Sequence, residues 1–334
     1  MIGLALRVAL FGGALAVCAL MPTWLGVFRT SQLAYVGIYF IAILGVNLVT
    51  GYTGQISLGH GAFMAIGGYT TAILVADHGV KDFWTLGLAG LSAGVAGLLF
   101  GIPALRLRGL YLALATFAVA VALPSVLRYE KLDGLTHGTD GINLFGVPDL
   151  TASLTPLDVF GHRLVFEDWL YYLTWTTAVV LFLVAWLALR ARPGRAWLAV
   201  RDSEVAASSF GVSPAAWKTA AFALSAFYAG VAGGLYALAS TFVNPQTFPV
   251  TLSLTLVVGA VVAGLGSLWG ILAGALLVQY LREDVVGRIT MEPGVADVVY
   301  GGVLVILMLL LPGGLAGIAR LIPSPVGSRF LGKS

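Results

Sequence analysis

Long apolar runs separated by short polar segments fill this 334-residue chain. A helix that crosses a bilayer needs about 20 mostly apolar residues. Runs of roughly that length are centred on residues 8–22, 33–50, 60–76, 85–105, 109–127, 169–189, 219–240 and 295–312. The apolar stretch from Thr251 to Leu281 is too long for one upright span and is interrupted by "GLGS" at 264–267, which predicts two short segments. The pattern therefore predicts an all-α, polytopic membrane helical bundle of about eight to ten transmembrane segments, some of them broken helices.

Composition supports the membrane assignment. Hydrophobic residues make up 59% of the chain, charged residues make up 10%, and the mean hydropathy is +0.96. A soluble globular domain has a charged fraction of about 25%, so this class is excluded. The net charge of +3 is small and unevenly distributed, which fits membrane topology and a lipid bilayer as surroundings, with no nucleic-acid partner.

The distribution of Lys and Arg predicts the orientation, because short loops rich in these residues stay in the cytoplasm. The segment 190–218 holds five basic and two acidic residues and is predicted to be cytoplasmic, with Arg106 and Arg108 on the same side. The loop 128–168 holds seven acidic and three basic residues and is predicted to be external. Both termini are then expected in the cytoplasm, with one transmembrane domain over 1–320 and a short cytoplasmic tail over 321–334.

The spans also lack the charged groups on which many carriers depend. Acidic and basic residues lie in loops or at helix ends. The exceptions are Arg7, near the start of the chain, and Asp297, near the start of the last predicted span. Proton- or ion-driven carriers usually need an acid or base buried at mid-membrane. This pattern disfavours a secondary carrier.

The cytoplasmic segment predicts a helix, a bend and a second helix. Asp202 or Ser203 is placed to cap a short helix that begins at Glu204, and Gly211 is placed to end it in the left-handed conformation. Ser213 followed by Pro214 then favours the start of a new helix. The alternative is an amphipathic loop on the lipid surface, anchored by Trp197 and Trp217.

This segment resembles the coupling loop of ABC importer permeases of the LivM-type branched-chain amino acid family, in which E-x-A-A-x-x-x-G is followed by Lys. The matching positions are Glu204, Ala206, Ala207, Gly211 and Lys218. "GYTGQISLGHGAF", "VVAGLGSLWGILAGALL" and "YGGVLVILMLLLPGGLAGI" are similar to that family in the same order. The resemblance implies a permease domain in the bacterial-type inner membrane. It also implies a second, LivH-like permease subunit, two ABC ATPase subunits and a periplasmic or extracellular substrate-binding protein.

The resemblance leaves the solute open: branched-chain or related small amino acids, or alternatively urea and short amides. A facilitative channel is a further alternative from a different class. No catalytic residues, metal site or cofactor are expected in this chain, and ATP is expected on the partner subunits. The final "GSRFLGKS" matches a phosphate-binding loop in its letters, but such a loop requires a strand before it and a helix after it, and prolines 323 and 325 precede the motif, so it is not expected to bind nucleotide.

Polar residues in the stretch "GYTGQISLGHGAF" at 51–63 interrupt two apolar runs. Irregular backbone inside a membrane is tolerated where it is buried in protein or lines a wet cavity, so this stretch predicts a broken helix on the substrate path. The candidate path residues are Asn47, Thr53, Gln55, Ser57 and His60. The alternatives are a simple polar turn at the cytoplasmic ends of two spans and, for His60, a hydrogen bond to a carbonyl.

Overall fold

The computed structural model describes residues 21–22, 26–104, 107, 109–145, 158–159, 162–163, 166–281, 301–302, 305–306, 309 and 314. The predicted span at 8–22 and the tail at 321–334 therefore lie wholly or almost wholly outside the described residues. Most of the span at 295–312, together with Arg106, Arg108 and part of the loop 128–168, also lies outside them.

Within the described part of the chain, five helices are long and apolar enough to cross a membrane. They are α2 (Val27–Val46) with its π-helical continuation η1 (Asn47–Gly51), α4 (Asp82–Ala104), α5 (Leu110–Leu127), α8 (Phe166–Arg190) and α11 (Pro214–Ser240). Three shorter apolar helices accompany them, namely α3 (His60–Ala76), α12 (Val250–Ala263) and α13 (Ile271–Tyr280). The prediction of an all-α membrane bundle is confirmed, and the predicted span at 60–76 coincides with α3.

The stretch 251–281 is divided as predicted. α12 ends at Ala263, the chain turns through 264–270, and α13 begins at Ile271. Gly264 and Gly266 have φ angles of +98° and +79° in this turn, a region that glycine enters without steric cost. The "GLGS" sequence therefore ends α12 because its glycines permit a turn that the flanking apolar residues would resist.

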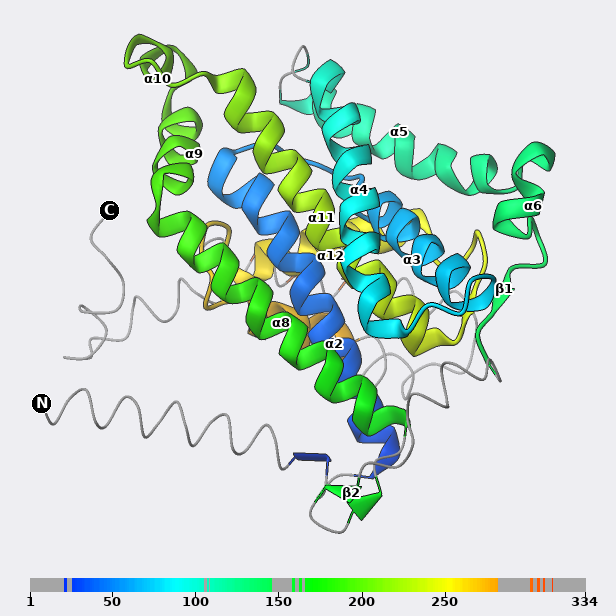
Figure 1. Ribbon diagram of the computed structural model, residues 1–334. Helices are drawn as coiled ribbons and strands as arrows, with labels where there is room; N and C mark the ends of the chain where they lie inside the picture. The colour runs from blue at the N-terminus through cyan, green and yellow to red at the C-terminus, as the bar shows by residue number, and fades with distance from the viewer. Residues whose placement is uncertain are drawn as a thin grey trace, which may run out of the picture.

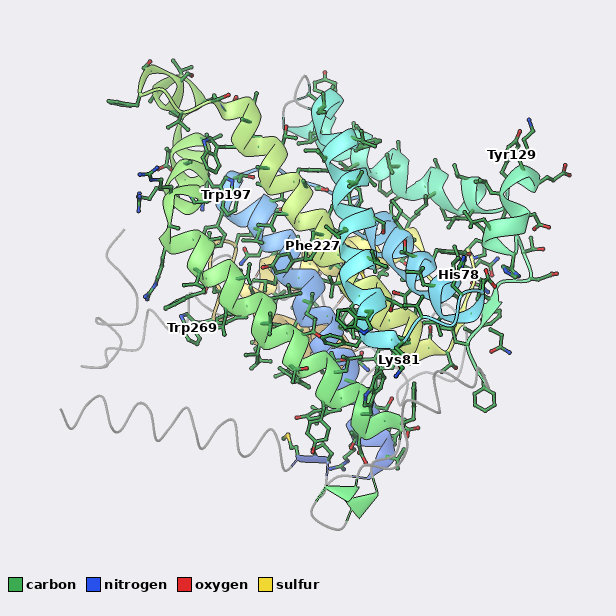
Figure 2. All side chains as sticks on the ribbon, viewed as in Figure 1. His78, Lys81, Tyr129, Trp197, Phe227 and Trp269 are labelled. Atoms are coloured by element: carbon green, nitrogen blue, oxygen red, sulfur yellow. The ribbon has the colours of Figure 1, made fainter. Side chains whose placement is uncertain are left out.

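The helices α2 and α11 form the centre of the bundle (Figure 1). In their most apolar windows 89% and 78% of residues are buried, compared with 39% for α4, 28% for α8 and 22% for α5. Small residues bring α11 close to α3 and α4. A Cβ placed on Gly67 would lie 2.5 Å from Gly230 Cα, and one placed on Gly90 would lie 2.7 Å from the Phe227 ring, which extends from α11 toward α4 (Figure 2).

One end of the bundle contains small connecting elements. These are η2 (Glu130–Leu132), α6 (Asp133–Thr136), β1 (Ile142–Asn143) and β4 (Phe242–Val243), with β1 and β4 paired antiparallel. A separate hairpin joins β2 (Asp158–Val159) to β3 (His162–Arg163). His137 Nε2 lies 3.5 Å from Asp77 Oδ2, so the loop that follows α3 meets the loop that follows α5.

The opposite end of the bundle contains α9 (Arg192–Asp202) and α10 (Glu204–Ser209), between the end of α8 and the start of α11 (Figure 1). α10 was predicted and is confirmed. α9 was not predicted, because its apolar run covers only 196–200 and Pro193 and Gly194 just before it are typical of a loop. The segment that resembles a coupling loop thus lies at the end of the bundle away from β1 and α6.

Candidate functional site

The polar stretch after α2 is a broken element. The α-helical ladder of α2 widens into η1, and the chain from Gly54 to Gly59 leaves the helix before α3 begins at His60. Two groups compensate for the interrupted ladder of hydrogen bonds. The backbone N–H of Gln55 donates to Val49 O at 3.1 Å, and Thr53 Oγ1 donates to the same carbonyl at 2.6 Å. π-helical turns within α-helices are frequent at functional sites, which makes this break the first candidate.

The break after α2 meets the turn between α12 and α13. Asn47 Oδ1 accepts from the Gly266 amide at 2.8 Å, and Asn47 Nδ2 donates to Ser267 O at 2.9 Å. We call Asn47, Gly51, Gly266 and Ser267 the junction. Only glycine fits at position 51, since a Cβ there would lie 2.5 Å from Gly266 N and would overlap Asn47 Oδ1. The two interruptions predicted from sequence are therefore one connected structure.

The junction receives one charged side chain from the segment 190–218. Arg201, the penultimate residue of α9, donates from Nη1 to Gly51 O at 2.6 Å. The same Nη1 would lie 3.2 Å from a Cβ on Gly266. The Gly51 carbonyl belongs to the last residue of η1, where helical carbonyls lack an intrahelical partner, so Arg201 satisfies an acceptor that the break exposes.

Two of the predicted path residues present polar atoms inside the protein. Ser57 is fully buried and Gln55 is 9% exposed. Within the described part of the chain, neither Gln55 Nε2 nor Ser57 Oγ has a hydrogen-bond partner. Buried polar groups are normally paired, and an exception often marks a functional group or a bound water molecule. Thr53 differs because its hydroxyl is already bonded to Val49 O, and Asn47 differs because both of its amide atoms are used at the junction.

His60 lies deep in the bundle. Its Nε2 is 2.6 Å from Ser225 Oγ, and Ser225 Oγ lies 2.6 Å from Gly45 O, which accepts from it. Ser225 stands eleven residues after Pro214, the first residue of α11, which is roughly 16 Å along a helix with a rise of about 1.5 Å per residue. The stretch 54–60 thus runs from the end of the bundle that holds α9 and α10 toward the middle of the bundle, and it is more than a turn at the surface.

The residues of the predicted coupling loop are brought together. Lys218 Nζ on α11 lies 2.5 Å from Glu204 Oε1 on α10. Just before Glu204, the Ser203 side chain accepts from the Ala206 amide at 3.2 Å, and Gly211, after α10, has a φ of +79°. The predicted cap, the predicted left-handed glycine and the predicted restart at Pro214 are all confirmed.

The two alanines of the same pattern differ in their surroundings. Ala207 is 3% exposed and packs inward, and its carbonyl accepts from the Val212 amide at 3.0 Å. Ala206 faces outward on α10. A small residue at 207 lets α10 fold back against its neighbours, which fixes the direction in which α10 presents its outer face.

Trp197 packs inside the protein. Its side chain is 3% exposed and lies between α9 and α11, where Nε1 donates to Trp217 O at 3.1 Å (Figure 2). The alternative in which Trp197 anchors the segment to the lipid surface is therefore wrong. The indole instead fixes α9 against the base of α11.

A small pocket connects the two sets of predicted residues. Gln55 from the broken stretch lines it together with Lys218 from the coupling loop, and the Thr219 side chain lies beside them. The pocket has a volume of about 10 Å³, which is room for roughly one water molecule. Thr219 Oγ1 is buried and, like Gln55 Nε2, has no partner among the described residues. The pocket places an unpaired amide and an unpaired hydroxyl beside the Glu204–Lys218 ion pair.

Comparison of the sequence with known proteins identifies its family. Residues 29–308 match the family described as branched-chain amino acid transport system, permease component. The chain is 36% identical over 303 residues to the Escherichia coli K12 high-affinity branched-chain amino acid transport system permease protein LivM. The aligned region covers 85% of this chain and 68% of LivM. This chain belongs to that permease family. The permease is also 25% identical over 293 residues to the E. coli K12 permease protein LivH, and the aligned region covers 84% of the permease and 91% of LivH. No solved structure gives a significant match.

Some residues of the site were not predicted from the sequence. Arg201 counted only as a positive charge, while Ser225 and Ser253 were read as parts of apolar spans. Ser253 Oγ accepts from the Gly61 amide at 2.9 Å, at the start of α3. A signal was available for both serines, because a solitary polar residue in a membrane helix usually has a partner inside the bundle.

Proposed function

We propose that the permease is the membrane subunit of an ATP-driven ABC importer for branched-chain or related small amino acids. It forms half of the translocation path and couples that path to separate ATPase subunits. Family membership supports transport of this kind, and the arrangement of α9, α10 and α11 is the observation that carries the ATP-coupled form. In this proposal the protein lies in the inner membrane, and both termini and the segment 190–218 lie in the cytoplasm.

The outer face of α10 suits contact with a separate protein. Val205 is 79% exposed and Phe210 is 87% exposed, at the end of the bundle opposite β1 and α6. Packing against the described residues does not explain why a six-residue helix presents apolar side chains away from the bundle. The Glu204–Lys218 ion pair and the Gly211 bend join α10 to α11, so force applied to α10 reaches a membrane helix directly.

The broken stretch supports the location of the path. The unpaired polar atoms of Gln55 and Ser57 lie inside the bundle, and the pocket beside Gln55 opens near the coupling segment. These groups supply hydrogen bonds for water or for a passing polar solute, in a region where lipid supplies none. The path residues are thus Gln55, Ser57 and His60, with Asn47 and Thr53 supporting the shape of the break.

The partners follow from the same proposal. LivM and LivH are permease proteins of high-affinity branched-chain amino acid transport systems, and this chain is similar to both. A second permease subunit related to LivH completes the path, two ATPase subunits bind the cytoplasmic face, and a binding protein delivers the solute from outside.

Reconstitution tests the proposal. The permease is purified with the second permease, the ATPases and the binding protein, and uptake of radiolabelled leucine into proteoliposomes is measured with and without internal ATP. Uptake that requires both ATP and the binding protein supports the importer. Uptake of urea or acetamide in place of leucine would assign the solute to the amide class. Uptake that continues without ATP and the ATPases would contradict the importer and support a carrier or channel.

A further inference from the structure

We propose that Arg201 is a positioning residue that connects the coupling segment directly to the junction of the two broken helices. The inference rests on the proposed function, because it assigns to Arg201 a part in transmitting ATPase movement. It adds a second mechanical connection to the one that α10 makes with α11 through Glu204 and Lys218.

The position of Arg201 in the chain makes the connection short. Arg201 lies one residue before the end of α9, and α10 begins at Glu204, three positions later. Ser203 lies between the two helices in extended backbone and caps α10, so the end of α9 and the start of α10 are joined without a flexible loop. A displacement of α10 therefore displaces the Arg201 backbone.

The guanidinium carries that displacement into the membrane region. Arg201 Nη1 donates to Gly51 O at 2.6 Å, although much of the Arg201 side chain is exposed. A hydrogen bond from a charged donor is stronger than one between neutral groups, and this one is partly buried. The Arg201 side chain also passes beside Gly54, where a Cβ would lie 3.3 Å from Arg201 Cγ. Arg201 thus contacts both sides of the Tyr52–Thr53 turn that leads into the path residues.

The junction then distributes the displacement. Gly51 packs against the Gly266 amide, and Asn47 hydrogen-bonds both Gly266 and Ser267. Gly314, beyond the predicted last span, also lies here, since a Cβ on it would be 2.5 Å from Gly264 Cα. Moving Gly51 away from Arg201 moves the end of η1 and the turn between α12 and α13 together. These are the backbone breaks on which opening and closing of a path depend.

Other basic residues of α9 provide a matched control. Arg195 lies on the same helix, and within the described part of the chain its guanidinium hydrogen-bonds only Arg190 O, at 3.4 Å, in its own segment. A charge removed at 195 changes the charge of the cytoplasmic segment as much as a charge removed at 201. Any difference between the two substitutions therefore reports the contact with the junction and not the loss of a positive charge.

The experiment compares Arg201→Met, Arg201→Lys and Arg195→Met in the complete purified complex. ATP-driven uptake, basal ATP hydrolysis and amide hydrogen exchange of residues 51–59 are measured for each. Arg201→Met is expected to reduce uptake by about tenfold, the scale of a typical coupling free energy, and to speed exchange in 51–59. Basal hydrolysis is expected to remain within about twofold, as for a surface substitution. Arg201→Lys keeps a charged donor without the planar fork and is expected to restore part of the uptake.

The possible results separate the inference from the proposed function. Wild-type exchange in Arg201→Met, or equal effects of Arg201→Met and Arg195→Met on uptake, would overturn the inference. If Arg201→Met does not assemble, Arg201→Lys decides, and normal uptake with normal exchange overturns it. A wild-type complex that takes up solute without ATP would instead overturn the proposed function and, with it, the coupling role. The exchange comparison would then still show whether Arg201 holds Gly51.

Discussion

Asn47 and Gly266 are joined by a hydrogen bond of 2.8 Å although they are 219 residues apart in the chain. The Asn47 side chain also binds Ser267 O, so one amide uses its acceptor and its donor on the same turn. This geometry substitutes for the helical hydrogen bonds that are lost where α12 ends. The break between α12 and α13 therefore lies next to the break that follows α2. The Asn47 side chain supplies hydrogen bonds to backbone groups of the turn that would otherwise lack partners in the membrane region.

Removing the Asn47 amide tests this pairing. Asn47→Leu leaves the Gly266 amide and Ser267 carbonyl without their partner and is expected to reduce stability by about 1–3 kcal/mol. Thr50→Val is the matched control, because the Thr50 hydroxyl is buried without a partner among the described residues and its removal is expected to be neutral or stabilising. Thermal unfolding in detergent measures both. A Thr50→Val loss as large as that of Asn47→Leu would show that the pairing contributes nothing specific.

The Glu204–Lys218 ion pair is expected to matter for coupling more than for stability. The side chains are 40% and 16% exposed, and an exposed pair contributes only about 0.2–1 kcal/mol. Glu204→Lys or Lys218→Glu alone places like charges together and should separate α10 from α11, with reduced ATP-driven uptake. The double exchange of Glu204→Lys with Lys218→Glu restores opposite charges and should recover most of the uptake. A double variant no better than the worse single variant would argue against the ion pair as the connection.

The elements that could be predicted depend on local sequence. Ser203, Gly211 and Pro214 fix the ends of α10 and α11 through capping and allowed φ, which are properties of a few neighbouring residues. The breaks at 51–59 and 264–270 were predicted because glycine and polar residues interrupt apolar runs. These features do not require knowledge of what lies beside them in space.

The contacts that connect these elements could not be predicted in this way. Nothing near Arg201 indicates that its side chain reaches Gly51, and nothing near Asn47 indicates Gly266, because both pairs arise from the packing of α9, α2 and α12. The helix α9 was missed because its apolar run at 196–200 is short and follows Pro193 and Gly194, which are typical of a loop. The lipid-anchor alternative for Trp197 failed for a related reason, since an indole suits the membrane surface and a protein interior equally well.

Gly211 offers a test of the bend alone. Its φ is +79°, and a Cβ added there would meet no atom within 4 Å, so a substitution changes backbone preference without creating a clash. Gly211→Val is expected to oppose the bend by about 1–2 kcal/mol and to uncouple ATP hydrolysis from uptake. Gly211→Asn tolerates the left-handed conformation better and should retain most coupling. If both variants keep substrate-stimulated ATP hydrolysis and uptake, the bend has no part in coupling.

The final prediction concerns Gln55, whose buried side-chain nitrogen Nε2 has no hydrogen-bond partner among the described residues. If Gln55 lines a path that opens alternately to the two sides, a cysteine at this position in a Cys18→Ser background should react with a small charged thiol reagent at a rate that changes when ATP is trapped. A cysteine at Ile56 is the control. This neighbour is 46% exposed and should react at a rate that changes less.

Substitution of the same residue gives the functional counterpart. Gln55→Leu should impair uptake with normal assembly, because leucine cannot supply the hydrogen bonds of a hydrated path. Thr53→Val should impair it less, because the Thr53 hydroxyl is already used by Val49 O and does not face the path. Labelling at Gln55 that ignores nucleotide, together with full activity of Gln55→Leu, would leave this stretch as a buried turn that supports η1 and α3 without touching the solute.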